Sequence, residues 1–174
     1  EAYGIYACNG ILFNHESPIR GETFVTKKII QGLVKIKLGF QKKLFLGNLY
    51  SKRDWGHARD YVEAMWKILQ QKKPEDFVIG TGKTFTIKDF VNRAAKKIKL
   101  DIKWIGKGIK EKAVNTETKK IIIECRSRYF RPLEVDYLKG NALRAKKILK
   151  WYPKISIDDL IDEMIKHELE NNND

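Results

Sequence analysis

The fold is decided by residues 5–13, Ile-Tyr-Ala-Cys-Asn-Gly-Ile-Leu-Phe, and by the segment 14–21 that follows, Asn-His-Glu-Ser-Pro-Ile-Arg-Gly. The first segment is a nearly continuous apolar run, which is typical of a strand buried on both faces of a parallel sheet. The second is polar, with Ser17-Pro18 and Gly21 as loop signals. Because open α/β sheets bind ligands beyond the carboxyl ends of their strands, this loop is a candidate binding segment.

Short apolar segments and amphipathic segments alternate along the rest of the chain. Apolar residues at helical spacing predict helices, two of which begin with a capping box of Ser or Thr and an Asp three residues later. Short apolar runs between turn signals predict strands. This alternation indicates the α/β class. The predicted helices contain residues 25–36, 61–69, 90–98, 141–149 and 160–164, and the predicted strands are 44–46, 77–79, 102–105 and 121–123.

Three further expectations concern particular segments. The second helix is expected to turn Met65 and Leu69, together with Tyr61, toward the core. Residues 107–120 are polar and charged, so we expect a mobile connection there. Residues 171–174 are expected to form a disordered tail.

Composition limits the classes of protein to consider. A length of 174 residues with 43% hydrophobic residues is enough for one folded domain with a core. No apolar run is long enough to cross a bilayer, so we expect no membrane association. Cys8 and Cys125 stand alone, and the histidines have no metal-ligand spacing. These features predict no metal site and a reducing, cytoplasmic location.

The net charge of +13 leaves two interpretations open. Lysines scattered over helix faces indicate a solvated surface, whereas a basic domain can also bind nucleic acid or a small polyanion. The arginines stand in more distinctive contexts. Arg53 precedes Asp54 and Trp55, which suggests a guanidinium fixed by its neighbouring carboxylate as a phosphate clamp. Residues 126–131 place three arginines around two aromatic residues, a composition that suits a nucleotide and single-stranded nucleic acid equally.

Three strings of residues resemble one enzyme family. They are Asn14-His15-Glu16-Ser17-Pro18, Arg53-Asp54-Trp55-Gly56-His57-Ala58, and Arg128-Tyr129-Phe130-Arg131-Pro132 with Glu134. In this order they are similar to the GDP-mannose 4,6-dehydratases, which are extended short-chain dehydrogenases/reductases, and the resemblance runs from the first residue to about residue 170. It implies the last part of an NADP-binding Rossmann domain, with its parallel sheet, at residues 1–21. A smaller mixed α/β substrate-binding region follows at residues 22–170, with some segments returning to the Rossmann domain.

The resemblance also implies roles for single residues. His15 and Arg20 match residues that contact NADP. Because of their charge, Arg53 and Arg131 are candidates for the diphosphate, and Glu134 suits ribose hydroxyls. Ile19 stands where the family usually has a second arginine, which leaves Arg20 alone for the cofactor phosphates. The residues that match the GDP-sugar site of the family are Asn14, Val25, Lys28, Arg53, Arg131 and Glu134.

The reaction that the resemblance implies converts GDP-mannose to GDP-4-keto-6-deoxymannose. NADP takes a hydride from C4, a base removes the C5 proton, water leaves from C6, and the hydride returns to C6. In the family this needs a glycine-rich NADP loop and a Tyr-x-x-x-Lys pair, and neither occurs in the chain. We therefore expect the segment that carries them to precede Glu1, no catalytic residue within these 174 residues, and a homo-oligomeric full-length enzyme.

Two alternatives stay open at this point. Another GDP- or dTDP-sugar epimerase or dehydratase of the same superfamily would share the architecture. A basic nucleic-acid-binding module would use residues 126–131 and the positive charge, and it would bind polynucleotides with a steep dependence on salt.

Overall fold

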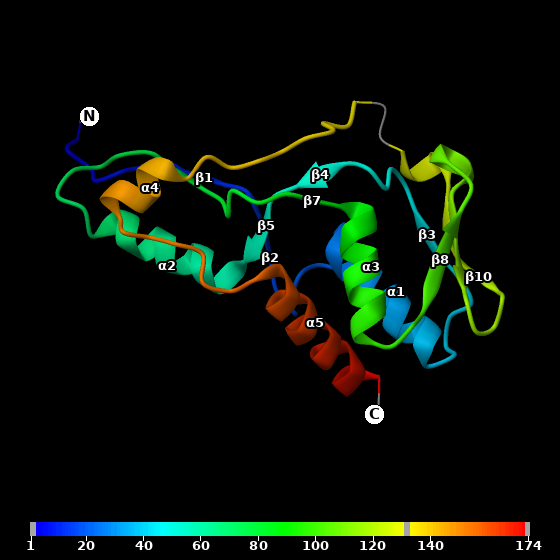
Figure 1. Cartoon of the computed structure of the whole chain (residues 1–174). Coiled ribbons are helices and arrows are strands. Elements are labelled where there is room, and N and C mark those ends of the chain that lie inside the picture. Colours follow the sequence, from blue (N-terminus) through cyan, green and yellow to red (C-terminus); the bar gives the residue numbers. More distant parts are fainter. Residues whose placement is uncertain (1–2, 131–132, 173–174) are drawn as a thin grey trace.

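The computed structural model describes residues 3–130 and 133–172, and Figure 1 shows the course of the chain. Helices and strands alternate, which confirms the α/β class. No helix within the described ranges is long and apolar enough to cross a membrane. The helices are α1 (Val25–Lys37), α2 (Ala58–Leu69), α3 (Ile87–Lys97), α4 (Leu143–Ile148) and α5 (Ile157–Asn171), with 3-10 turns η1 (Gly108–Lys110) and η2 (Ser127–Tyr129). The strands are β1 (Gly10–Leu12), β2 (Asn14–Glu16), β3 (Leu44–Leu46), β4 (Lys52–Arg53), β5 (Trp55–His57), β6 (Phe77–Ile79), β7 (Phe85–Thr86), β8 (Ile102–Ile105), β9 (Lys112–Asn115) and β10 (Ile121–Cys125).

The strands form small sheets that bring the predicted site segments together. β1 pairs in parallel with β6, and β2 pairs in parallel with β5 so that Asn14 lies opposite Trp55 and Glu16 opposite His57. β4 and β7 form an antiparallel pair. The order β3-β10-β9-β8 makes a mixed sheet at the other end of the molecule. The carboxyl ends of β2 and β5 therefore share one edge, from which the loop 17–21 and α2 both start.

Two hydrophobic clusters form the core, and they lie toward opposite ends of the molecule in Figure 1. The larger cluster packs α1, α3 and α5 against one another and against the mixed sheet. The smaller cluster joins α2, α4 and β6 around the fully buried Trp151. Asp54, which is completely buried, lies at the junction, where it accepts hydrogen bonds from the backbone of Thr81, Gly82 and Gly140.

Local sequence signals located most elements correctly. α1 buries Ile29, Leu33 and their neighbours, as their spacing predicts. The capping boxes at Thr86 and Ser156 are both formed, with the hydroxyl and the Asp side chain each bonded to the other residue's backbone N–H. The four predicted strands also occur, and the strand at residues 121–123 continues to Cys125.

The first strand is shorter and more exposed than its apolar sequence predicts. β1 pairs in parallel with β6, as expected, but Ile5 is 70% and Ile11 is 56% exposed. Among the described residues β1 has a hydrogen-bonded neighbour on one edge only. The prediction of a strand buried on both faces is therefore wrong for this structure, because no described residue packs closely enough over these side chains to bury them.

Three other expectations need correction. Met65 and Leu69 of α2 are 39% and 58% exposed, because the apolar arc of this helix is wider than the surface that packs against it; Tyr61 is buried as predicted. Residues 107–120 are not a structureless connection, since they contain η1 and β9, and β9 pairs on both sides with β8 and β10. The expected tail begins too early, because α5 includes Asn171; residues 173–174 lie outside the described residues.

Candidate functional site

A cavity of about 540 Å³ lies where the loop after β2, the start of α1, the turn after β3 and η2 meet. Five residues predicted for the GDP-sugar site line it, although they are far apart in the sequence. Both polar and apolar side chains line it, which is typical of a site for a small ligand. The lining residues are Asn14, Thr23, Phe24, Val25, Lys28, Leu46, Gly47, Asn48, Arg53, Ile87, Arg128, Tyr129 and Glu134.

Arg53 is held at the cavity by a carboxylate that is distant in the sequence. Its Nη2 donates to Glu134 Oε1 at 2.9 Å, and its Nη1 donates to the carbonyl of Lys52 at 3.0 Å. The sequence-based interpretation that Asp54 fixes Arg53 is wrong, because both Asp54 oxygens are already engaged with Thr81, Gly82 and Gly140. The Arg53 side chain is only 12% exposed, so this cation is partly desolvated and pre-oriented.

Lys28, Arg128 and Tyr129 form a second cationic group in the same cavity. Lys28 Nζ lies 3.8 Å from the centre of the Tyr129 ring, and Arg128 Nη2 donates to the Tyr129 hydroxyl at 2.8 Å. Burial is the main reason that the pKa of Lys28 is lowered; the Arg128 cation adds to this shift, and the Tyr129 hydroxyl opposes it. An anionic ligand would relieve the repulsion between the two cations.

Gly47 allows this group to approach the turn after β3. A Cβ atom built at Gly47 would lie 2.2 Å from the carbonyl oxygen of Tyr129, well inside contact distance. Only glycine therefore fits here, and η2 packs its backbone directly on the turn. The next residue, Asn48, accepts a hydrogen bond from the Tyr50 N–H with its side-chain oxygen, so its amide group is directed by the turn itself.

The two residues predicted for the cofactor, His15 and Arg20, do not line this cavity. The His15 ring bonds the Phe13 carbonyl through Nδ1 at 3.0 Å and lies against Tyr61, with the ring centres 5.1 Å apart. The Arg20 guanidinium stacks on the Phe24 ring at 3.4 Å. Phe24 is thus in contact with Arg20 and also lines the cavity.

Beneath Arg20 lies the buried carboxylate of Glu16. Arg20 Nε is 3.2 Å from Glu16 Oε2, yet this Nε is buried and has no hydrogen-bond geometry to any described residue, so the contact is one of charge alone. Burial raises the pKa of Glu16, while the hydroxyl of Thr26 and the charges of Arg20 and His15 pull it down. The Arg20 side chain keeps 22% of its surface exposed, and a guanidinium suits a phosphate.

Known proteins with similar sequences identify the family of this chain. The sequence model described as GDP-mannose 4,6 dehydratase matches residues 1–164. The chain belongs to the GDP-mannose 4,6-dehydratase family. A family member from Dictyostelium discoideum is 53% identical over 98% of this chain, and one from Sinorhizobium fredii is 49% identical over 97%. The chain spans about half the length of these relatives, 48% in both cases.

Solved structures share the fold at low sequence identity. RMD from Pseudomonas aeruginosa, complexed with NADPH, has a TM-score of 0.77 and 16% identity, and covers 96% of this chain and 49% of its own. A dTDP-glucose 4,6-dehydratase from Bacillus anthracis in complex with NAD has a TM-score of 0.72 and 18% identity, covering 95% of this chain and 45% of its own. The chain thus has the fold of one half of these extended dehydrogenase/reductase structures.

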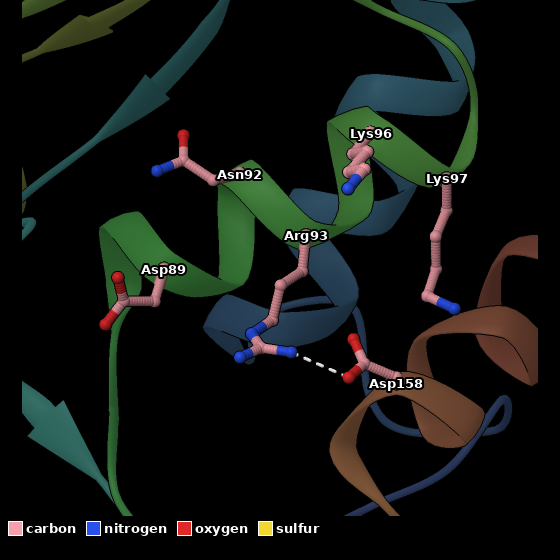
Figure 2. A pocket seen from close by; sticks show the side chains of 6 residues that line it. All are labelled: Asp89, Asn92, Arg93, Lys96, Lys97 and Asp158. Carbon is pink, nitrogen blue, oxygen red and sulfur yellow. Dashed lines mark hydrogen bonds and ion pairs between the residues drawn. The ribbon is translucent and has the colours of Figure 1, made fainter.

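Another hollow lies outside the residues that the family resemblance points to. A groove of about 680 Å³ between α3 and the start of α5 is shown in Figure 2. Its charges are largely paired: Arg93 Nη1 contacts Asp158 Oδ2 at 2.7 Å, and Lys97 pairs with Asp162 of the next helical turn. Asp89 is used in the capping box of α3. Apart from the exposed Lys96, the charged side chains of the groove are therefore engaged with protein partners.

Some of the residues that line the cavity are predicted from the sequence, and others are not. The structure brings together Asn14, Val25, Lys28, Arg53 and Glu134, while the predicted Arg131 lies outside the described residues. Arg128 belonged to the arginine-aromatic segment that the sequence singled out, but it was not assigned a role. The turn at Gly47 and Asn48 gave only a turn signal, because its contact with Tyr129 joins residues distant in the chain.

Proposed function

We propose that this chain is the substrate-binding half of an enzyme that converts GDP-mannose to GDP-4-keto-6-deoxymannose with NADP. The observation that carries the proposal is the cavity in which Arg53, Lys28 and Arg128 converge with the single carboxylate of Glu134. Three cations suit a diphosphate, and a carboxylate that accepts hydrogen bonds suits the hydroxyl groups of a sugar. The relatives that are about half identical to this chain are named GDP-mannose 4,6-dehydratases.

The loop after β2 favours NADP as the cofactor of this enzyme. Its Arg20 is held between the Phe24 ring and the Glu16 carboxylate and keeps 22% of its side chain exposed, which suits a guanidinium that binds an anionic group. When bound, NADP supplies the hydride acceptor and donor for the sugar. The roles that fall to this chain are to hold the diphosphate with Arg53, to orient the sugar nucleotide with Asn14 and Val25, and to hold the cofactor with His15 and Arg20.

The experiment is turnover by the full-length enzyme that contains these residues. We expect it to form a 4-keto-6-deoxy sugar from GDP-mannose with catalytic amounts of NADP. Mass spectrometry identifies the product. dTDP-glucose, UDP-glucose and GDP-glucose serve as competing substrates. Conversion of one of these in place of GDP-mannose would overturn the substrate assignment and favour a related epimerase or dehydratase.

We further propose that residues 1–174 alone do not turn over substrate. No Tyr-x-x-x-Lys pair occurs in them, and the family resemblance assigns hydride and proton transfer to such a pair. Activity of the isolated chain under the same assay would contradict this. A homo-oligomeric full-length enzyme and a cytoplasmic location stay predictions from the sequence.

A further inference from the structure

A group of buried polar side chains lies under the loop 17–21, apart from the cavity lining. Glu16, Thr26, Lys27 and Glu168 are each at most 5% exposed. Thr26 Oγ1 donates to Glu16 Oε2 at 2.7 Å. Lys27 Nζ forms an ion pair with Glu168, which comes from the last turns of α5, 141 residues further along the chain.

The Lys27–Glu168 pair is also hydrogen-bonded to the backbone of the loop. Lys27 Nζ donates to the carbonyl of Pro18 at 2.6 Å, and the loop then closes a turn in which the Arg20 N–H donates to the Ser17 carbonyl at 3.0 Å. Arg20 itself rests between Phe24 and the carboxylate of Glu16. The position of the Arg20 guanidinium is thus set from below by a lysine that α5 holds in place.

Stability alone does not explain such an arrangement. The cost of removing two charges from water commonly equals or exceeds their mutual attraction, so a buried pair is a weak contributor to folding free energy. Lys27 nevertheless donates one hydrogen bond to the carbonyl of Pro18 and pairs with Glu168. The neighbouring Ile19 is 87% exposed and carries no charge, so Arg20 is the cation that this loop offers.

We propose that Lys27 and Glu168 are positioning residues for the cofactor: they fix the loop through Pro18 so that Arg20 meets a phosphate of the bound dinucleotide. This inference rests on the proposed function, since it concerns the cofactor of that enzyme. It assigns α5 a role at the cofactor loop, although α5 contributes no residue to the sugar-nucleotide cavity.

The test is a titration of the full-length enzyme with NADPH, followed by nicotinamide fluorescence, and with GDP, followed by calorimetry. The double variant Lys27→Met/Glu168→Met replaces both charges by apolar side chains of similar length, which buried pairs often tolerate without loss of stability. We expect its Kd for NADPH to rise by about tenfold or more, while its Kd for GDP changes less than about twofold. Lys166→Met/Glu170→Met removes an exposed pair of the same helix, with side chains 79% and 63% exposed, and is expected to leave both constants unchanged.

A double-mutant cycle with Arg20→Met tests whether the pair acts through Arg20. In that background the Lys27→Met/Glu168→Met exchange is expected to add little further loss of NADPH affinity, because the guanidinium that it positions is already absent. Wild-type NADPH affinity in the double variant, equal losses for NADPH and GDP, or full additivity with Arg20→Met would each overturn the inference. Failure of the unsubstituted enzyme to bind NADPH would instead refute the proposed function.

Discussion

Arg53 illustrates how a single side chain is prepared for a ligand. The guanidinium is 12% exposed and is held by Glu134 and by a backbone carbonyl, so little conformational entropy is lost when it binds an anion. Its position could be read from the sequence, because the Arg-Asp-Trp string is distinctive. Its partner could not, since Glu134 lies 81 residues away and the adjacent Asp54 serves another purpose.

Replacing Arg53 by methionine is expected to weaken binding of GDP-mannose. Hydrogen bonds to charged groups contribute about 1.5–3 kcal/mol, which corresponds to a KM raised roughly ten- to hundredfold. Because such an interaction holds the substrate in ground state and transition state alike, kcat should change far less than KM. Steady-state kinetics of the full-length enzyme measure both. Arg59→Met is the matched control, since the Arg59 side chain is 72% exposed and pairs with Glu163 away from the cavity; a similar KM increase there would contradict the assignment.

At the scale of elements, local sequence patterns predict where the helices lie but not which of their side chains are buried. The capping boxes of α3 and α5 and the apolar stripe of α1 depend on residues within one or two turns, so the sequence could predict them. Whether an apolar side chain is covered depends on distant elements. That is why Met65 and Leu69 of α2 were assigned to the core and are exposed. The same limit hid β9, whose order comes from pairing with β8 and β10.

The contact between η2 and the turn after β3 gives a prediction at this scale. In Gly47→Ala the new Cβ would need the space 2.2 Å from the Tyr129 carbonyl oxygen, so η2 must move and shift Arg128 and Tyr129. We expect the KM for GDP-mannose to rise by about tenfold, the loss of roughly one charge-assisted contact.

Gly39→Ala separates this effect from a general loss of stability. Gly39 has φ of +83° but no atom within 4 Å of the added Cβ, so alanine there is strained without being crowded. It is expected to lower Tm while leaving KM unchanged. If Gly47→Ala lowered Tm in the same way without affecting KM, η2 would not position ligand-binding residues.

At the scale of the whole molecule, two hydrophobic clusters are joined by polar groups. His57 is one of these: its Nδ1 accepts from the Arg59 N–H at the start of α2, and its Nε2 contacts Glu163 of α5 at 2.7 Å. His57 is thus the cap of α2. Long-range junctions of this kind leave no periodic pattern in a sequence. For this reason the resemblance to a family predicts more of the architecture than the residue patterns do.

Asp54 is the other junction, and its loss should affect the whole molecule. Its Oδ1 accepts from the Thr81 N–H and hydroxyl, and its Oδ2 accepts from the N–H groups of Gly82 and Gly140. In Asp54→Asn the amide nitrogen would face either the N–H groups of Gly82 and Gly140 or Thr81, whose hydroxyl can donate to the Lys83 carbonyl instead. At least one buried N–H group then loses its acceptor. A buried unsatisfied donor costs about 1–3 kcal/mol, so we expect the free energy of unfolding to fall by at least that amount.

Urea denaturation of the full-length enzyme measures the change, and hydrogen exchange locates it, with faster exchange expected at the amides of Thr81, Gly82 and Gly140. Asp158→Asn is the control, because Asp158 pairs with Arg93 at the surface and such pairs contribute about 0–1 kcal/mol. An equally small effect of Asp54→Asn would mean that the backbones of Gly80 and Gly140 hold the two clusters together by packing, since a Cβ at Gly80 would lie only 3.0 Å from the Gly140 Cα.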